Sequence, residues 1–582
     1  MACGPCCAAA ARVACDTLPP VNLPSPALVT QGAARRLPRA GLALLVAAYA
    51  LPGFWGRDPW KSADVAAFGY MAELAGGGNW MQPALLGLPP DFPALLPYWM
   101  GALAIKALSP ALAPELAVRL PFLALLLLAL LCTWHAIFHL ARSRGAQPVA
   151  FAFGGEAGPT DYARALADAG LLALIACLGL AQFSHETTPA LAQLAFTATL
   201  LSGSASLSWQ PVRSLAISAF GLLGLTLSGA PHLALAFGLS AAAVWASQTR
   251  DPATSVRPVH SLLLAAIALG GYGMAAALGL LHWSLGWPGA GAQAWDGIAR
   301  ALLWFTWPAG PLALWSLWRW RGHWRQPHLA LPLACAAIAL TGAVFTANIE
   351  RPLLLALPAL AALAAFALPT LRRSLAALID WFTLLFFSGC ATVIWVVWLA
   401  LQTGVPATPA ANVARLAPGF EHNFSWTLLV PALLASLLWA GLVAWRVGRH
   451  RSALWKSMVL PAGGATLCWL LLMTLWLPLL DYARSHRLLL DQVAQHVQRD
   501  DCIEIQALAR GQLAALRHVG RLTLEQHAAA GRCRWLLLGV GTPADVEFAL
   551  SRDPRQWEPV AMNLRVESRE AVRLLRRVAA RP

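Results

Sequence analysis

The sequence predicts an all-α polytopic membrane protein with a small α/β domain at its C-terminus. Of its 582 residues, 58% are hydrophobic and only 12% are charged, and the mean hydropathy is +0.59. A soluble domain of average composition carries about 25% charged residues, so a soluble, disordered or fibrous protein is excluded. The net charge of +15 comes from arginines scattered between apolar runs. That distribution argues against nucleic-acid binding and is typical of the loops of a membrane protein.

Thirteen apolar stretches are long enough to cross a bilayer as helices, at about 17–25 residues each. They lie near residues 40–56, 121–141, 166–183, 187–205, 213–229, 231–248, 260–283, 300–318, 329–346, 352–369, 378–401, 426–445 and 458–479. These stretches predict a transmembrane domain over residues 40–480.

The arginines predict the orientation of these spans. Basic residues gather in alternate loops, whereas the short links on the other side contribute only Arg351. This positive-inside pattern places the N-terminal extension 1–39, which we expect to be disordered, in the cytoplasm. An odd number of spans then places residues 481–582 outside. We expect no cleavable signal peptide, because the first apolar run comes late and no small-residue cleavage pattern follows it.

The segment 481–582 differs in character from the rest of the chain. It carries 16 Arg and 12 acidic residues, and short β-like runs at 502–505 and 535–539 alternate with helical patterns. These features predict a small α/β domain. Cys502 and Cys533 each begin or precede one of the predicted strands, so neighbouring strands could bring them together as a disulfide in an oxidising periplasm.

No metal site is predicted. Cys3, Cys6 and Cys7 form a CxxCC run, but no second pair of ligands follows at the spacing of a zinc finger. His185 has no other His or Cys of the outer face at a matching spacing. Cysteines inside the apolar runs are expected to pack as small hydrophobic residues.

The first outer loop, residues 57–120, concentrates charged side chains. They are Arg57, Asp58, Lys61, Asp64, Glu73, Asp91, Lys106, Glu115 and Arg119. Carboxylates beside Lys and Arg could hold a phosphate and supply a base next to it. Glu186 lies in another outer link, between the third and fourth spans.

Two helices are predicted within this loop. Residues 63–75 have helical spacing and end at three consecutive glycines. Residues 95–108 form an amphipathic, Trp-bearing segment bounded by prolines, which is expected to lie along the membrane interface. Asp64 therefore falls at the start of a helix, where an N-cap role is the alternative to a chemical one.

Residues along the chain resemble a known family. The first loop reads Trp60-Lys61-Ser62-Ala63-Asp64, Gly78-Asn79-Trp80, Leu85-Leu86-Gly87, Asp91 and Tyr98-Trp99, and it is followed by Val118-Arg119-Leu120-Pro121. Further matches are Phe183-Ser184-His185-Glu186-Thr187-Thr188-Pro189, Arg351-Pro352 and Leu477-Pro478-Leu479-Leu480-Asp481-Tyr482. In their order and sidedness, over about residues 40–500, they resemble the aminoarabinose transferases and related GT-C glycosyltransferases.

The resemblance implies a GT-C fold and an inverting glycosyl transfer. The donor would be a sugar on a polyprenyl (undecaprenyl) phosphate, and the acceptor a glycolipid such as lipid A at the outer face of the bacterial inner membrane. Nothing in the sequence calls for a cofactor, and the need for a divalent metal stays open. Implied catalytic residues are Asp64, Asp91 and Glu186, with Asp58 as an auxiliary acid, and implied donor-phosphate ligands are Lys61, Arg119 and Arg351.

Two departures from the family pattern leave alternatives open. The first acidic residue of the family's pair aligns with Ala63, and the lysine expected after Asp91 is Phe92. One alternative is therefore a degenerate member that binds a lipid-linked sugar without transferring it. A lipid or solute transporter is another, although neither an internal repeat nor paired broken spans are visible in the sequence.

Overall fold

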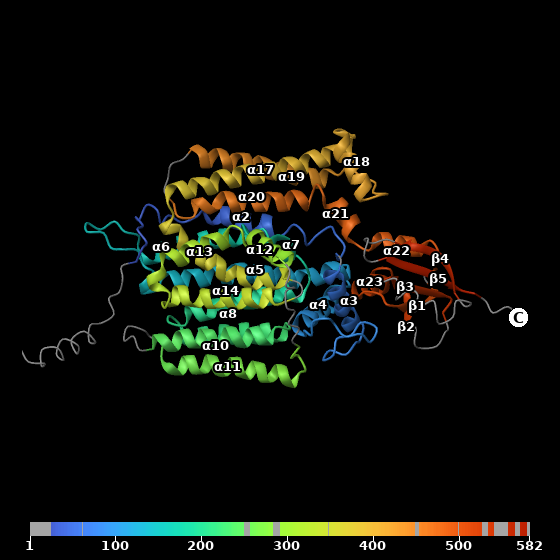
Figure 1. Ribbon diagram of the computed structural model, residues 1–582, viewed down its shortest axis with the longest axis horizontal. Helices are drawn as coiled ribbons and strands as arrows, with labels where there is room; N and C mark the ends of the chain where they lie inside the picture. The colour runs from blue at the N-terminus through green and yellow to red at the C-terminus, as the bar shows by residue number, and fades with distance from the viewer. Residues whose placement is uncertain are drawn as a thin grey trace, which may run out of the picture.

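A bundle of long helices carries a small sheet domain at one end (Figure 1). The computed structural model describes residues 25–60, 62–249, 256–282, 292–346, 349–448, 453–498, 500–526, 533–540, 557–564 and 571–578. Helices α3 (Ala63–Ala75) and α4 (Leu96–Leu108) of the first loop lie at the same end as the sheet (Figure 1). We call this end of the bundle the loop end.

Each predicted apolar stretch coincides with a helix or a pair of helices. The bundle contains α2 (Arg39–Ala50), α5 (Pro114–Ala141), α6 (Pro159–Ile175), α7 (Leu180–Phe183), α8 (Pro189–Ser206), α9 (Pro211–Leu227), α10 (Pro231–Gln248), α11 (Pro258–Ala277), α12 (Ala292–Thr306), α13 (Ala309–Arg319), α14 (Pro327–Val344), α15 (Glu350–Leu353), α16 (Leu357–Ala367), α17 (Arg373–Thr403), α18 (Ala407–Leu416), α19 (Trp426–Gly448), α20 (Lys456–Leu472) and α21 (Leu477–Arg484). Many of these helices begin at a proline, whose missing N–H costs nothing in the first turn.

Among the described residues, six helices are long and apolar enough to cross a membrane, or seven if the bent pair α20–α21 is one span. The protein is thus a multi-pass membrane protein, and the count of thirteen spans stays a prediction. The stretch 300–318, expected to be a single helix, is divided between α12 and α13. Pro308 lies at this break, because proline cannot donate a backbone hydrogen bond and clashes with the preceding turn.

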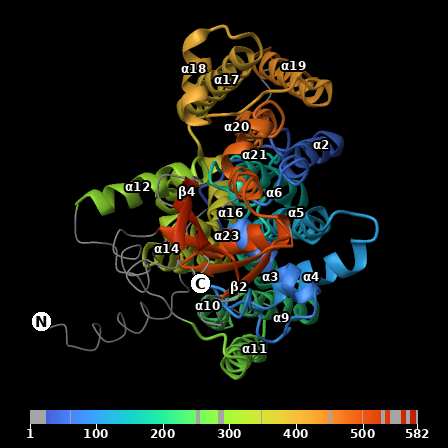
Figure 2. The ribbon, with the colours of Figure 1, turned by 90° about the vertical axis from the view of Figure 1, so that its right-hand side faces the viewer.

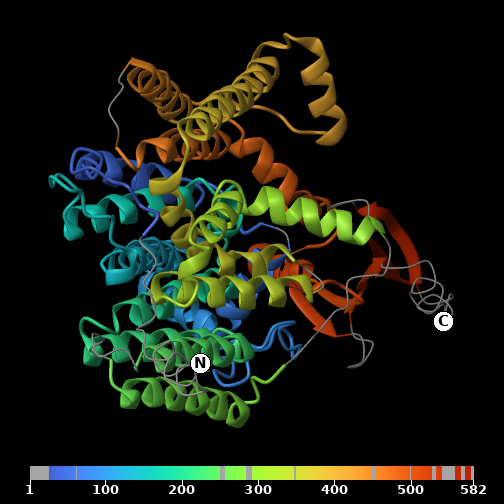
Figure 3. The ribbon, with the colours of Figure 1, turned by 60° about the vertical axis from the view of Figure 1, so that its left-hand side comes forward.

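The centre of the bundle is built from small side chains. Every residue of α16 is buried, and so are most residues of α6 and α8. Gly170 of α6 lies so close to α5 that an added Cβ would approach the Ile137 side chain to 2.3 Å. Helices α17, α18 and α19 instead form a layer that stands out from the bundle (Figures 2 and 3). Their exposed apolar side chains, such as Leu385 and Leu437, face the surroundings, as expected for lipid contact.

The N-terminal extension 1–39 differs in part from the predicted disorder. Residues 25–38 pair with the loop that follows α5, where the carbonyls of Ala27 and Val29 each accept a backbone hydrogen bond at 3.0 Å. Extended pairing of this kind leaves no helical periodicity in the sequence, so the prediction missed it. Residues 1–24 lie outside the described part of the chain.

The C-terminal segment forms the predicted small α/β domain. Its elements are α22 (Arg487–Ala494), β1 (Cys502–Gln506), α23 (Arg510–Ala514), β2 (Thr523–Gln526), β3 (Trp535–Val540), β4 (Trp557–Leu564) and β5 (Ala571–Arg577). The strand order is β2-β1-β3-β5-β4, with β1 parallel to both neighbours and β5 antiparallel to β3 and β4. The strands expected at 502–505 and 535–539 are β1 and β3, which are neighbours in the sheet.

This pairing brings together the two cysteines of the domain. Cys502 and Cys533 form a disulfide, with their Cα atoms 5.0 Å apart and their positions separated by 31 in the chain. In the chain-entropy description, closing a loop of this length lowers the entropy of the unfolded chain and so stabilises the folded domain by about 3–4 kcal/mol. Replacing both cysteines with serine is therefore expected to destabilise the C-terminal domain by about that amount. Limited proteolysis of the membrane-reconstituted protein checks this, and cleavage rates equal to those of the parent would contradict it.

The C-terminal domain packs directly on the first loop. A Cβ added to Gly69 of α3 would lie 2.5 Å from the Cβ of Ala514 in α23, so only glycine allows this approach. Glu73 of α3 also forms an ion pair with Arg517 at 3.2 Å. The domain therefore covers the loop that carries the predicted site residues, as the end-on view shows (Figure 2).

Candidate functional site

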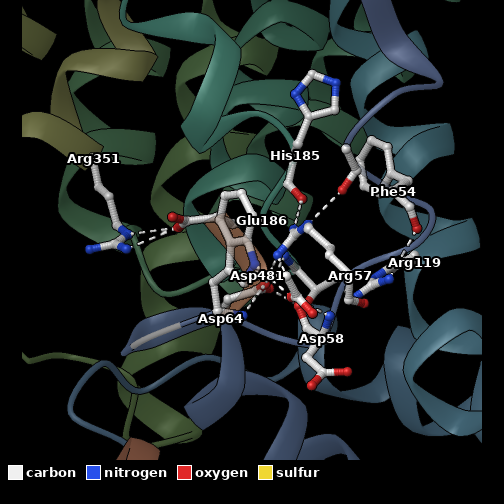
Figure 4. Close-up of polar contacts among 12 residues, drawn as sticks. Phe54, Arg57, Asp58, Asp64, Arg119, His185, Glu186, Arg351 and Asp481 are labelled. Carbon is white, nitrogen blue, oxygen red and sulfur yellow. Dashed lines mark hydrogen bonds and ion pairs between the residues drawn. The ribbon is translucent and has the colours of Figure 1, made fainter. Parts of the chain in front are cut away.

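Three segments that are far apart in the sequence meet at the loop end (Figure 4). They are the start of the first loop over residues 53–64, the link 184–188 between α7 and α8, and the short helix α15. Two carboxylates of the predicted site lie here, Glu186 on the link itself and Asp64 at the start of α3 (Figure 4).

Asp64 is fully enclosed by hydrogen-bond donors. It lies in the first turn of α3 and is 1% exposed. One carboxylate oxygen, Oδ1, accepts bonds from the backbone N–H and the hydroxyl of Thr187, both at 2.7 Å. The other, Oδ2, accepts from Arg57 Nη1 at 2.9 Å and from the backbone N–H of Trp60 at 3.1 Å.

These donors determine the charge of Asp64. Burial by itself raises the pKa of the carboxyl, but the charges of Arg57 and Arg119 and the two bonds from Thr187 outweigh burial and hold the pKa below its usual range. The helix begins at Ala63 with Ser62 as its N-cap residue, so Asp64 is not an N-cap. Asp64 is therefore an ionised anchor between the first loop and the 184–188 link.

Two buried arginines hold the same backbone. Arg57 donates to the carbonyl of Gly53 at 2.6 Å and to that of His185 at 2.7 Å. Arg119 donates to the carbonyls of Phe54 at 3.1 Å and Arg57 at 2.7 Å. The structure thus places Arg119, which the resemblance assigned to a donor phosphate, among backbone carbonyls of the first loop.

Glu186 forms the second carboxylate site, with Arg351 as its partner. Both Nη2 and Nε of Arg351 donate to Oε2 of Glu186, at 2.9 and 3.3 Å. Glu186 is 3% exposed, whereas the side chain of Arg351 is 30% exposed. Within the described part of the chain, the hydrogen bonds found for this carboxylate both come from Arg351 and both go to Oε2.

The surroundings of Glu186 favour its protonated form. Burial raises the pKa of its carboxyl, and the negative charge of Asp64 raises it further. The attraction of Arg351 lowers this pKa but does not cancel the effect of burial. The two carboxylates thus have pKa values shifted in opposite directions. Pairs of titratable groups separated in this way are common at sites of acid–base chemistry.

A cavity of about 170 Å³ reaches the residue that follows Arg351 in the chain, although neither Arg351 nor Glu186 lines it. Pro352, which follows Arg351 in the chain, lines it together with Phe92 and Pro93 of the first loop. Other lining residues include Gln193 of α8, His232 at the start of α10 and Thr346 just after α14. The residue that replaces the family's lysine, Phe92, is therefore part of the wall of this cavity.

Asp58 joins the first loop to the C-terminal domain. Its carboxylate pairs with Arg487 of α22, with one contact at 2.8 Å. Its backbone N–H donates to Oδ1 of Asp481 at 2.8 Å, and the indole N–H of Trp60 donates to the same oxygen at 3.0 Å. The auxiliary acid of the prediction is thus occupied in a contact between domains.

The remaining predicted residues lie apart from this network. Asp91 has a side chain that is 73% exposed and lies 4.0 Å from Arg510 of α23. Lys61 falls outside the described residues. Among the described residues, Cys502, Glu525 and Cys533 are close enough together to hold a metal ion, but the two sulfurs are joined in the disulfide.

Sequence reasoning did not single out Thr187, Arg57 or Asp481 as site residues. Thr187 and Asp481 occur in the runs that carry the family resemblance, which is the one signal that could have found them. Arg57 is counted among the charged side chains of the first loop, but without a role of its own.

Solved structures share this arrangement of elements. The crystal structure of ArnT from Cupriavidus metallidurans bound to undecaprenyl phosphate matches with a TM-score of 0.56 and 14% sequence identity, covering 92% of this chain and 98% of that chain. The apo structure of the same protein matches with a TM-score of 0.55 and 15% identity, covering 92% and 96%. The chain has the fold of ArnT. The resemblance to the aminoarabinose transferases is confirmed at the level of the ArnT fold.

No family model and no curated protein matches the sequence. At 14–15% identity the likeness to ArnT reports on the fold, and the chemistry has to be argued from the residues of this chain.

Proposed function

We propose that the protein is a membrane glycosyltransferase that moves a sugar from a polyprenyl phosphate donor to a glycolipid acceptor such as lipid A. The observation that carries the proposal is the ion pair between the buried Glu186 and the partly exposed Arg351, which is followed in the chain by the cavity-lining Pro352. The ArnT fold supports it, since one of the matching ArnT structures is bound to undecaprenyl phosphate. The positive-inside pattern supports the bacterial inner membrane with the loop end in the periplasm.

The reaction needs a cation at the leaving group and a base at the acceptor. An acceptor oxygen attacks the anomeric carbon from the face opposite the phosphate, so the configuration inverts. The bond from this carbon to the phosphate oxygen breaks, and the lipid phosphate leaves with the bonding electrons. In our proposal Arg351 stabilises the charge that develops on this phosphate, and Oε1 of Glu186 takes the proton of an acceptor hydroxyl.

The raised pKa of Glu186 suits the role of a base. A general base works best when its pKa lies near the operating pH, and burial moves this carboxyl in that direction. We assign Asp64, Arg57 and Arg119 to positioning, since they fix the link that presents Glu186. Asp91 precedes the cavity-lining Phe92 and would be a second carboxylate within reach of an acceptor.

A transfer assay with purified protein in lipid tests the proposal. Radiolabelled polyprenyl phosphate sugars are offered to a total lipid and lipopolysaccharide extract, with and without a chelator. Arg351→Gln is expected to lower transfer by about 10²–10³-fold, the usual cost of losing a donor that stabilises developing charge. The matched control is Arg415→Gln, which removes an exposed arginine of α18 and should leave transfer unchanged.

The other outcomes are also informative. Saturable binding of the donor with no transfer to any acceptor would overturn the proposal in favour of a protein that binds lipid-linked sugar. Equal activities of the Arg351→Gln and Arg415→Gln variants would remove Arg351 from the site.

A further inference from the structure

A second, larger cavity lies away from the loop end. Its volume is about 380 Å³, and it opens between the segment that precedes α2 and helices α2, α6, α19 and α20. The basic residues that line it come from the ends of these elements: Arg35 and Arg36 precede α2, and Lys456 begins α20. Because α20 leads through α21 to the C-terminal domain, Lys456 lies at the end of the bundle opposite the loop end (Figure 1). We call this cavity the basal groove.

The walls of the basal groove are apolar over about two helical turns. Leu45, Leu172, Leu442 and Val459 line it, and on α20 it extends from Lys456 to residue 463. Seven residues of helix span about 10 Å, so the groove is deep enough for the first part of an acyl chain. Its floor is open at α2, because a Cβ added to Gly41 would meet no atom within 4 Å.

The mouth of the basal groove is positively charged. Among the described residues that line it there are three cations, Arg35, Arg36 and Lys456, and no Asp or Glu. Arg36 pairs with Asp161 at 3.1 Å. Lys456 interacts electrostatically with Asp380, a carboxylate that also pairs with Arg446, so four cations face two carboxylates here. The charge of the mouth is therefore complementary to an anion.

Two tryptophans hold this mouth in place. The rings of Trp445 and Trp455 are parallel, with centroids 6.3 Å apart, and Lys456 Nζ lies 5.7 Å from the Trp445 ring. The indole N–H of Trp455 donates to the carbonyl of Arg35 at 2.7 Å. Tryptophan with Lys or Arg is the combination found at the level of lipid headgroups.

We propose that the basal groove binds an anionic phospholipid of the leaflet at this end of the bundle. Its phosphate lies against Arg35 and Lys456, and an acyl chain follows Leu45, Leu442 and Val459. A free phosphate would leave the apolar length of the groove unfilled, and a zwitterionic lipid would bring its own cation to a positive mouth. Such a lipid joins the segment before α2 to α19 and α20, and so ties the outlying layer of the bundle to its first helix.

Native mass spectrometry of the delipidated full-length protein tests this proposal. The protein is titrated with dioleoyl phosphatidylglycerol, with dioleoyl phosphatidylcholine and with undecaprenyl phosphate, and the affinity of the first lipid bound is measured. Arg35→Gln should weaken the binding of phosphatidylglycerol about fivefold, the usual effect of one cation at a lipid surface. The matched control is Arg39→Gln, which removes an exposed arginine at the start of α2 that does not line the groove.

A second pair of variants tests the apolar part. Gly41→Trp fills the groove and should abolish the binding of the first lipid. The control, Gly273→Trp, adds the same side chain on α11, where a Cβ also meets no atom within 4 Å. This control should leave the binding of the first lipid unchanged. Equal affinities for phosphatidylglycerol and phosphatidylcholine, or equal effects of Arg35→Gln and Arg39→Gln, would overturn the proposal. Tighter binding of undecaprenyl phosphate than of phosphatidylglycerol would overturn it in favour of a site for the polyprenyl lipid. The comparison of lipids and the arginine pair decide the outcome even if Gly41→Trp does not fold.

Discussion

Replacing Asp64 with asparagine is expected to destabilise the folded protein by about 3–5 kcal/mol, the cost of removing one partner from a buried ion pair. The loss leaves the charge of Arg57, whose side chain is 2% exposed, without its counter-ion. The second charge, that of Arg119, also loses the attraction of the Asp64 carboxylate. Thermal unfolding of the detergent-purified protein, followed by intrinsic fluorescence, measures the effect.

Asp91→Asn is the matched control for this substitution. The same chemical change on a side chain that is 73% exposed should alter stability by no more than about 0.5 kcal/mol. If Asp64→Asn were as stable as this control and yet inactive in transfer, Asp64 would have a chemical role and our assignment to positioning would be wrong.

The pKa of Asp64 also predicts how this anchor responds to acid. Its pKa is lowered in the folded protein, so the ionised carboxylate adds stability above its ordinary value of 3.8. That stability is lost only as the pH falls through the lower pKa of the folded state. The anchor should therefore remain intact at any mildly acidic pH used in an assay.

Replacing Glu186 with glutamine is expected to lower kcat by about 10²–10⁴-fold, the typical contribution of a general base. The protein should remain folded, because the amide oxygen still accepts a bond from Arg351 and the 30% exposed arginine stays solvated. Transfer by Glu115→Gln, the same change in the first turn of α5, should equal that of the parent. Full activity of Glu186→Gln would exclude this residue as the base.

The pH dependence separates this role from a structural one. The pKa of Glu186 is raised in the folded protein above the ordinary glutamate value of 4.5. The protonated carboxyl therefore adds to the stability of the fold at pH values below 4.5. This added stability is lost as the pH rises through the higher pKa of the folded state. The base works only when ionised, so transfer should fall on the acid side at a pH above 4.5. This acid limb should disappear in Glu186→Gln, which a merely structural role would not cause.

The helices and strands that local patterns determine could be predicted from the sequence. The helix at 63–75 follows from its apolar spacing and the three glycines after it, and α3 has these bounds. The strands β1 and β3 follow from two short apolar runs in a charged segment. Both cases depend on neighbours within a few residues, which the sequence shows directly.

The site could be predicted only in part, because its contacts join distant segments. The hydrogen bonds between Asp64 and Thr187 join residues 123 positions apart. The spacing of apolar residues in the sequence predicts helices but does not predict which link packs against which loop. Arg119 shows the same limit. Its sequence context fits a phosphate ligand. In the structure its guanidinium instead donates to the carbonyls of Phe54 and Arg57, and these carbonyls come within reach only after the first span has packed.

The contact between Asp58 and Asp481 has a consequence for how the protein is made. These residues are 423 positions apart, so at about 5–20 residues per second a ribosome needs roughly 20–85 s to synthesise the second after the first. Throughout that time the first loop lacks the partners that α21 and α22 supply. The hydrogen bonds of Asp58 and Trp60 to Asp481 can therefore form only after α21 has been synthesised, so this part of the loop end is completed late in synthesis.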